Sequence, residues 1–368
     1  MPAESPPPGS AFKHWFDEAR YRRIAGLLAE HCRNFDHRKF LSLTLTGLAE
    51  RSLMERLRQT ALAYDAALPG SFRDKLDVLR TIAPKVDHAF VAISIGDFVA
   101  RIGLDDARHA LDALREITRY GSSEFAVRPF LQRDLTGTLA IMATWARDSD
   151  EHVRRLASEG SRPRLPWGLR LTELVKDPRP TAPILEALRN DPSLYVRKSV
   201  ANHLNDITKD HPEVVMDMLE RWDRSVLEAA WIARHALRTL IKRGDVRALG
   251  LMGVRVDAKV RAERFVVRPR RVRLGGRIEL VAKIVSEAKR RQRLIIDYVV
   301  HYVKASGRAS AKVFKWKAVT LEPGGTLAIS KQQHIRDYST RRHHAGRHVV
   351  ELQVNGRRVA RDYFQLIQ

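Results

Sequence analysis

The sequence has 368 residues, a formal net charge of +23 and a pI of about 10.6. Its length allows two or three domains, and an apolar share of 44% is enough for a buried core. The charge exceeds the roughly 2–8 that keeps a small domain soluble, which favours a polyanionic partner, nucleic acid before an anionic membrane. One cysteine excludes an internal disulfide and a Cys-based zinc site.

The first ten residues, Met-Pro-Ala-Glu-Ser-Pro-Pro-Pro-Gly-Ser, predict a disordered N-terminus over residues 1–10. They lack the basic and apolar regions of a signal peptide. No apolar run reaches the length of a membrane span. We therefore expect a soluble cytoplasmic protein.

Residues 11–257 carry apolar side chains at helical spacing almost without interruption, which predicts one helical domain. The joints between the helices contain Pro, Gly or Asp, as at Pro69-Gly70 and Gly121-Ser122. The helical stripes in the first half of this region run over 14–32, 40–68, 72–86, 89–102 and 105–120.

The later part of the helical region repeats itself. Asp-turn-Val-Arg followed by an apolar helix occurs at Val153-Arg154 and again, 43 residues later, at Val196-Arg197. A looser third copy covers 231–237. A period of roughly 40–47 residues with two helices per unit is typical of HEAT-like repeats, which stack into a curved solenoid.

From residue 258 the apolar pattern alternates, which predicts strands at 264–269, 277–285, 294–303, 311–319, 325–329, 346–354 and 359–366. Asn355-Gly356 is a strong hairpin signal. Seven short strands over residues 258–368 are typical of an immunoglobulin-like sandwich. The predicted fold is thus mainly α, a HEAT-like helical-repeat solenoid followed by a C-terminal all-β immunoglobulin-like sandwich.

The predicted sandwich is strongly basic, with 26 Lys and Arg against 8 Asp and Glu from residue 258 onward. Its most basic loop, 338–348, suits the electronegative minor groove of DNA, although a solvated charged loop is the alternative. Histidines at this spacing could bind a metal, but the surrounding arginines disfavour one, and we expect none. The predicted DNA contacts of this loop are Arg341, Arg342, His343, His344 and Arg347.

Three carboxylates occupy comparable places in successive helical units. Glu124 follows a Gly-Ser-Ser joint, Glu159 closes the second helix of a repeat, and Asp206 lies near the end of a helix. Equivalent helix ends of stacked repeats lie along one edge of a solenoid. Acids there would oppose phosphate binding unless they faced a cation. Taken singly, a carboxylate at such a place is more often a solvated or helix-capping group.

Trp167 stands in Ser-Arg-Pro-Arg-Leu-Pro-Trp-Gly, where two prolines and a glycine disfavour a regular helix. A tryptophan on a stiff loop can offer its π face to a sugar or a cation, or it can simply fill a repeat junction. Arg162 and Arg164 precede it and are predicted phosphate contacts. Arg197 and Lys198, in the second Val-Arg repeat, are predicted to contact DNA as well.

The segment 159–167 together with Val196-Arg-Lys-Ser-Val-Ala-Asn-His-Leu-Asn-Asp206 resembles the AlkC family of alkylpurine DNA glycosylases. The resemblance covers the helical region and extends to the basic sandwich, which some members of that family carry. It implies hydrolysis of the N-glycosidic bond of 3-methyladenine and 3-methylcytosine in double-stranded DNA without base flipping. It places the catalytic cluster on Glu124, Glu159, Trp167 and Asp206, with the shortest matching motif around Glu124.

That resemblance implies a monofunctional enzyme in which carboxylates stabilise the cationic sugar, Asp206 positions water and Trp167 packs on the sugar. It requires no cofactor or metal, and we expect a monomer. The alternative is a non-enzymatic HEAT-repeat scaffold that binds nucleic acid, which would gain nothing from these acids. Membrane attachment is a third hypothesis, disfavoured because the sequence shows no basic amphipathic helix with a Trp/Phe/Leu face.

Overall fold

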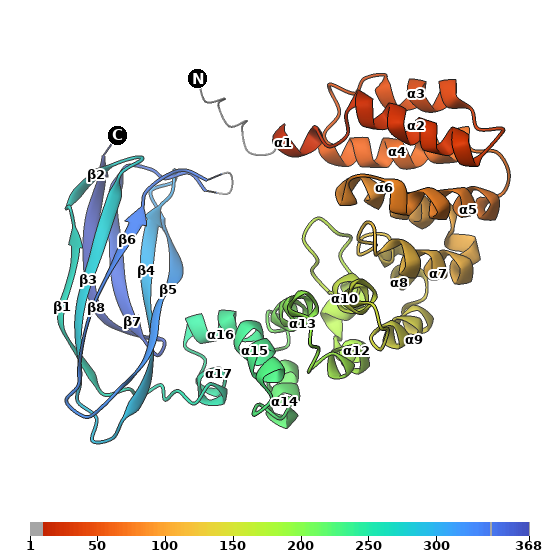
Figure 1. The fold of residues 1–368 in the computed structure, drawn as a ribbon. Coiled ribbons are helices and arrows are strands. Elements are labelled where there is room, and N and C mark those ends of the chain that lie inside the picture. The colour runs from red at the N-terminus through yellow and green to blue at the C-terminus, as the bar shows by residue number, and fades with distance from the viewer. Residues whose placement is uncertain (1–9, 339–340, 368) are drawn as a thin grey trace. The chain divides into compact units, whose positions relative to one another are not determined.

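A computed structural model describes residues 10–338 and 341–367 of the chain. The predicted disordered segment 1–10 lies outside this range except for Ser10, which begins the first helix. The chain forms two compact units, Met1–Ala236 and Leu237–Gln368. Helices fill the first unit and strands dominate the second (Figure 1), which confirms the predicted fold class of helical repeats before an all-β domain.

The helical unit consists of helices joined by short connections. Their bounds are α1 Ser10–Lys13, α2 Glu18–His31, α3 His37–Leu45, α4 Leu53–Ala67, α5 Phe72–Ile82, α6 Ala89–Ile102, α7 Ala107–Ile117, α8 Arg128–Arg133, α9 Leu135–Trp145, α10 Glu151–Gly160, α11 Thr172–Lys176, α12 Ala182–Ala187, α13 Leu194–Ile207, α14 Pro212–Arg221 and α15 Leu227–Ala236. Short 3₁₀ turns at Ala83–Lys85, Leu104–Asp106 and Arg179–Thr181 complete them.

These helices stack in two rows. One row runs through α2, α5 and α7 and continues with α9 and α12, whereas the other runs through α4, α6 and α8 and continues with α10, α13 and α15. The row that includes α10 and α13 lies on the concave side of the curved stack (Figure 1). This curved, two-row arrangement is the one expected for paired helical repeats.

The predicted Val-Arg repeat has a structural counterpart. Arg154 donates through Nη1 to the carbonyl oxygens of Asp148 at 3.0 Å and Ser149 at 2.8 Å. Arg197 makes the same two bonds, to the carbonyls of Asp191 at 2.9 Å and Pro192 at 2.7 Å. Each arginine therefore pins the turn that leads into its own helix, which explains why the pair of residues recurs 43 positions apart.

One predicted helical stretch is divided. The apolar stripe over 40–68 forms α3 and α4, separated by residues 46–52. Gly47 adopts a φ of +69°, a left-handed conformation that ends a helix readily. Ser52 then begins α4 with a capping box, in which its side chain and that of Glu55 each bond the other residue's backbone N–H. The apolar spacing alone could not show this break.

The second unit contains two packed sheets, of order β1-β3-β6 and β2-β8-β7-β4-β5. All of the strand pairs are antiparallel except β2 with β8. The strands are β1 Val260–Arg268, β2 Arg271–Arg273, β3 Arg277–Ser286, β4 Gln292–Val303, β5 Ala309–Leu321, β6 Thr326–His334, β7 Gly346–Val354 and β8 Arg357–Ile367. Among the described strands, β2 is the one that the sequence analysis did not predict, because three residues are too few to show an alternation of apolar and polar side chains.

The predicted hairpin turn at Asn355-Gly356 is present between β7 and β8. Both residues have positive φ, 47° and 81°, as a type I′ turn requires. A Cβ on Gly356 would lie 2.2 Å from the Cα of Gly244, so this turn also needs glycine for close packing. Gly244 follows the short helix α16, Arg238–Arg243, and this contact places a helical segment directly against the sandwich.

Two short helices belong to the second unit, α16 Arg238–Arg243 and α17 Val246–Leu251. The side chain of Gln353, on β7, donates to the Lys242 carbonyl of α16 at 3.1 Å. The predicted boundary at 257/258 therefore marks where helices give way to strands, whereas the compact unit already begins at Leu237. Helical periodicity could not reveal which neighbour these two helices pack against.

Asp297 is a buried carboxyl group on β4, with 1% of its surface exposed. Its Oδ1 and the Oε1 of Gln353 are both buried and make no hydrogen bond within the described residues. Burial, opposed by Lys242 and Lys315, raises the pKa of Asp297 to about 6. The neutral form thus stabilises the fold below about pH 4, and this contribution is lost as the pH rises through about 6.

We expect Asp297→Asn to raise the free energy of unfolding at neutral pH by about 1–3 kcal/mol, because the amide carries no charge and can donate to Gln353. The gain should disappear below about pH 4, where the native carboxyl is neutral. Urea unfolding of the wild type and of Asp297→Asn, at neutral pH and at about pH 4, measures the difference in the free energy of unfolding. A difference that does not change with pH would contradict this account of Asp297.

Candidate active site

The three predicted carboxylates come together on the helical unit. Glu124 lies between α7 and α8, Glu159 is in the last turn of α10, and Asp206 is in the last turn of α13. Arg155 donates to Glu124 Oε2 at 2.5 Å, and its other terminal nitrogen lies 3.7 Å from Glu159 Oε1. Its guanidinium also lies 4.7 Å from the centre of the Tyr195 ring. Arg155 therefore links the first two acids.

Arg162 links the second acid to the third. It donates to Glu159 Oε1 at 2.6 Å and to Asp206 Oδ2 at 2.9 and 2.8 Å. Lys209 donates to the other carboxylate oxygen of Asp206, Oδ1, at 2.8 Å. Acids from three successive repeats thus form one continuous chain of ion pairs with the basic residues between them.

The same contacts change the expected electrostatics of the site. The sequence indicated acids aligned along one edge of the solenoid, and in the structure each of the three acids has at least one basic partner. Only 8% of the Glu159 side chain and 5% of the Asp206 side chain are exposed. Buried charges of this kind persist only when they are paired. The site is therefore an ordered array of ion pairs rather than a bare negative surface.

Not every carboxylate oxygen in the array is occupied. Glu124 accepts from Ser122 and Arg155 through Oε2, and Glu159 accepts from Arg162 through Oε1. Glu124 Oε1 and Glu159 Oε2 make no hydrogen bond with the described part of the chain. The arginines thus hold each carboxylate in place and leave it an acceptor for a substrate.

Trp167 lies on the loop that follows α10, and 75% of its surface is exposed. Its φ of 63° is left-handed, an uncommon conformation for a bulky residue. Arg128 donates to the carbonyls of Gly160 at 2.8 Å and Leu169 at 2.5 Å, so it ties the two ends of this loop together. A fixed loop therefore presents the indole to solvent and does not bury it in a repeat junction.

Arg128 and His203 are buried beside the ion pairs. Burial lowers the pKa of Arg128 to about 10, so it remains cationic at neutral pH. Burial also lowers the pKa of His203 to about 3, helped by the charge of Arg162, so this imidazole is neutral. Its Nδ1 lies 3.0 Å from the Ser158 carbonyl, which assigns the proton to Nδ1. His203 therefore adds no charge to the site.

The predicted DNA contacts of the helical unit lie in different surroundings. Arg162 is 7% exposed and bridges two acids. Arg164 forms two parallel 2.8 Å bonds with Asp210, and a quarter of its side chain is exposed. Arg197 bonds the carbonyls of its own turn and is half-buried, and Lys198 is exposed. Lys198 is thus the most exposed of these side chains, Arg164 and Arg197 are half-buried, and Arg162 alone of the four is buried.

Sequence reasoning did not find Arg155, Arg128 or His203. Arg155 precedes Glu159 by four residues on one helix, a spacing that brings side chains together and could have suggested the pair. Arg128 and His203 gave no such signal, because their partners are backbone carbonyls distant in the sequence.

The predicted DNA-binding loop of the sandwich connects β6 and β7, and the structure describes it without residues 339 and 340. The Arg341 guanidinium lies 4.8 Å from the Tyr302 ring centre, and that of Arg347 lies 3.9 Å from the Tyr363 ring centre. Arg342 is exposed and His344 partly so, whereas the His343 side chain is buried and bonded to Asp337. Exposed surface therefore remains on Arg341, Arg342, His344 and Arg347. The buried His343 helps to hold the loop in place through its bond to Asp337.

Two other features bear on the earlier hypotheses. In residues 10–338 and 341–367, no three His, Cys, Asp or Glu side chains form a group able to hold a metal ion. His348 instead stacks on Phe364 at 4.9 Å, with an angle of 7° between the rings. No helix among these residues has the length and apolar character needed to cross a bilayer.

Family models match most of the chain. The family described as "DNA alkylation repair enzyme" matches residues 88–240, which contain all four predicted catalytic residues. The family described as "Uncharacterised protein YhaZ, C-terminal Ig-like domain" matches residues 261–368. The immunoglobulin-like interpretation of the sandwich is thereby confirmed.

Two relatives cover nearly the whole sequence. The uncharacterized protein YhaZ of Bacillus subtilis (strain 168) is 39% identical over 324 residues, which span 88% of this chain and 90% of that protein. The alkylpurine DNA glycosylase AlkC of Pseudomonas fluorescens, solved bound to DNA containing an abasic site analog, is 46% identical with a TM-score of 0.94. That similarity covers 97% of this chain and 99% of the AlkC chain.

Proposed function

The chain belongs to the AlkC group of the DNA alkylation repair enzyme family, and on that premise we propose that it is a monofunctional DNA glycosylase for cationic N-alkylated bases. Its substrates are 3-methyladenine and 3-methylcytosine in double-stranded DNA, and its reaction is hydrolysis of the N-glycosidic bond. The observation that most supports this function is that Glu124, Glu159 and Asp206, from three repeats, lie in one array of ion pairs.

The chemistry assigns a role to the free carboxylate oxygens. An N3-alkylated base already carries a positive charge, so it leaves without protonation by a general acid. Positive charge then develops on the deoxyribose, as in other glycosidic cleavages. Glu124 Oε1 and Glu159 Oε2 are acceptors fixed in advance, and fixed negative groups lower the energy of such a state without reorganising.

Asp206 positions the attacking water in this proposal. Two nitrogens of Arg162 lie at its Oδ2, whereas Lys209 is the one described donor to its Oδ1, and a carboxylate oxygen has two lone pairs. The remaining lone pair of Oδ1 can accept a hydrogen bond from water and orient it toward the sugar. Trp167 packs on the same sugar from its exposed loop. No cofactor or metal takes part.

Base release without flipping is also part of the proposal. Five cavities among the described residues have volumes of about 220–670 Å³, and Glu124, Glu159 and Asp206 line none of these five. A glycosylase that flips its base takes it into a fitted pocket. An enzyme without such a pocket depends on a glycosidic bond that is already weak, which restricts it to cationic lesions.

Incubation with N-methylated genomic DNA, followed by chromatography of the released bases, tests this function. We expect release of 3-methyladenine and 3-methylcytosine and little release of neutral lesions. Release of hypoxanthine or 8-oxoguanine at similar rates would contradict the mechanism. Duplex binding with no base release would instead favour the alternative function, a non-enzymatic nucleic-acid scaffold.

Backbone contacts are proposed for Arg164 and Lys198 on the helical unit and for the β6–β7 loop on the sandwich. The exposed arginines of that loop suit a minor groove, where phosphates of both strands raise the negative potential. We further propose that the protein acts as a monomer on DNA in the bacterial cytoplasm.

Trp167→Ala is expected to slow 3-methyladenine release by about 10- to 100-fold, because the sugar loses the aromatic surface beside its developing charge. Folding stability should change little, since three quarters of the side chain is already exposed. Single-turnover release and thermal melting measure the two effects. Trp167→Phe, which keeps an aromatic face, serves as the control and should retain most activity; equal losses in both variants would contradict the stacking role.

Removal of residues 237–368 is expected to weaken duplex binding and to reduce the slope of log K against log salt by at least about 2. The reason is the excess of basic residues in the deleted unit. The cut is placed after Ala236, whose carbonyl oxygen accepts a hydrogen bond from Asn205 of the helical unit. A cut at residue 257 would instead separate α16 and α17 from the sandwich, to which α16 is bonded through Gln353. Unchanged affinity and slope would show that the sandwich does not contact DNA.

A further inference from the structure

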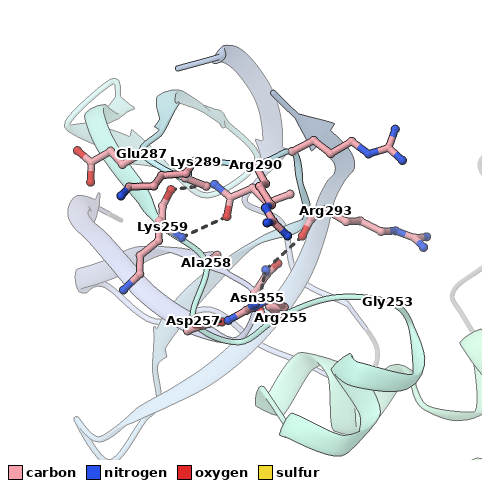
Figure 2. A pocket seen from close by; sticks show the side chains of 13 residues that line it. Gly253, Arg255, Asp257, Ala258, Lys259, Glu287, Lys289, Arg290, Arg293 and Asn355 are labelled. Carbon is pink, nitrogen blue, oxygen red and sulfur yellow. Dashed lines mark hydrogen bonds and ion pairs between the residues drawn. The ribbon is translucent and has the colours of Figure 1, made fainter. Parts of the chain in front are cut away.

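A hollow at one end of the sandwich plays no part in the proposed reaction. It has a volume of about 580 Å³ and is lined by residues 253–259, residues 287–293 and Asn355, all within the second unit. Residues 253–259 connect α17 to β1, and Gly253, Arg255, Asp257, Ala258 and Lys259 of this segment face the hollow. Residues 287–291 connect β3 to β4. Figure 2 shows these segments around the opening, and the hollow is called the linker pocket below.

Two amide side chains hold the frame of the linker pocket. Asn355, with 1% of its surface exposed, donates to the carbonyls of Arg255 at 2.7 Å and Arg293 at 3.3 Å. Gln292 accepts from the Lys259 N–H at 3.2 Å and donates to the Lys259 carbonyl at 2.8 Å. Figure 2 draws these bonds between the facing segments. The backbone around the hollow is therefore fixed in position before any ligand arrives.

The lining carries more positive charge than its own acids can neutralise. Asp257 is held by Arg255 at 3.0 and 2.8 Å, and Glu287 by Arg261 at 3.1 Å. The basic residues of the lining are Arg255, Lys259, Lys289, Arg290, Arg291 and Arg293.

Lys289, Arg290 and Arg291 form an exposed run on the loop between β3 and β4. Their side chains make no hydrogen bond or ion pair with the residues that the structure describes. Three neighbouring cations without partners repel one another, and an anion that binds all three relieves that repulsion.

The lining also indicates which anion fits. It contains no aromatic side chain, so it cannot stack a nucleobase, and its only apolar side chains are Ala258 and Ala288. A membrane-binding surface would need larger apolar groups to insert between lipids. Arginine and lysine without aromatic neighbours match phosphodiester oxygens and read no sequence. The favoured partner is thus the sugar–phosphate backbone of nucleic acid.

The linker pocket lies far from the β6–β7 loop. Strand β4 begins at Gln292 in the pocket and ends at Val303, which lines a different hollow together with His343 and His344. A strand of 12 residues spans about 36 Å. That length is about one helical turn of DNA. A phosphate in the pocket and a groove at the loop therefore occupy opposite ends of the sandwich.

We propose that the linker pocket is a second, sequence-independent site for backbone phosphates, separate from the β6–β7 loop. The proposal rests on the proposed function only in taking DNA as the polyanion that the protein meets. A contact with phosphates remote from the lesion is equally strong before and during base release. It therefore strengthens DNA binding and leaves the chemical step unchanged.

The test uses the full chain and a fluorescein-labelled, lesion-free duplex of about three helical turns. Anisotropy gives K at several salt concentrations for the wild type, for a pocket variant and for a control variant with the same charge change. The pocket variant is Lys289→Gln with Arg290→Gln and Arg291→Gln, and the control is Lys39→Gln with Arg33→Gln and Arg38→Gln, three exposed residues of the helical unit.

We expect the pocket variant to lower the slope of log K against log salt by about 2–3, and the control to lower it by less than about 1. Melting temperature should not change in either variant, because all six side chains are exposed. Single-turnover release of 3-methyladenine at saturating enzyme should stay within about two-fold of the wild type.

Equal slopes for the pocket and control variants would overturn the proposal. The proposal would also be overturned if the protein sedimented with phosphatidylglycerol vesicles only when Lys289, Arg290 and Arg291 were intact, while its duplex binding did not depend on these three residues. Failure of the proposed function looks different, because the wild type would then release no 3-methyladenine while the slope difference between the variants remained.

Discussion

Replacement of Asp206 by Asn, or of Glu159 by Gln, is expected to slow 3-methyladenine release by at least about 100-fold while duplex affinity stays within about three-fold. Each amide keeps the shape of the carboxylate and its acceptor oxygen but loses the negative charge. The charge matters only when the sugar becomes cationic, so its loss appears in the chemical step. Single-turnover release at saturating enzyme measures that step, and anisotropy with an uncleaved duplex measures binding.

Two matched controls separate this effect from a general loss of charge. Asp177→Asn and Glu173→Gln make the same replacements in surface ion pairs with Arg179 and Lys176. Exposed pairs of this kind contribute at most about 1 kcal/mol, so both controls should retain full activity and stability. Full activity in the Asp206 and Glu159 variants would refute the assignment of the site, whereas loss of duplex binding in them would indicate misfolding.

The pH profile of release gives an independent check on the same site. His203 lies beside Arg162, but its pKa of about 3 keeps it neutral throughout the working range. The mechanism uses no histidine, so we expect no activity change that follows a histidine titration near pH 6.5. An inflection there that disappeared in His203→Gln would require a different set of catalytic groups.

Much of this site was predictable because its residues sit in recurring local patterns. Glu159 and Asp206 occupy the ends of helices that begin with the same Val-Arg pair, and the repeat predicts that such ends align. Trp167 stood out because prolines on its N-terminal side and a glycine after it exclude a helix. These inferences need only neighbours in the sequence or a constant period.

Contacts between distant residues were not predictable in the same way. Arg162 meets Asp206 across 44 positions, and the sequence around it suggested a phosphate contact instead. The packing of α16 against the sandwich depends on Gln353, 111 residues away. Patterns of apolar residues describe one element at a time, so they do not identify which polar group will satisfy a buried charge on another.

Arg162→Met is the second large effect that we expect. Methionine fills a similar space but leaves Glu159 and Asp206 buried without the cation that joins them. Removing one partner of a buried ion pair destabilises a protein by about 3–5 kcal/mol. Urea unfolding should show a loss of that order, and release of 3-methyladenine should fall by at least about 100-fold because neither carboxylate is held in place.

The same variant distinguishes two roles for Arg162. If this residue binds a phosphate, as its sequence suggested, Arg162→Met should weaken duplex binding, reduce the salt slope by about 1 and leave stability unchanged. If it orients the two acids, stability and the rate of release should fall while affinity at low temperature remains. Arg162→Lys should recover part of the stability but little of the rate, because one ammonium group lacks the planar fork that reaches both carboxylates. Arg164→Met is the control: its pair with Asp210 is partly exposed, so only affinity should change.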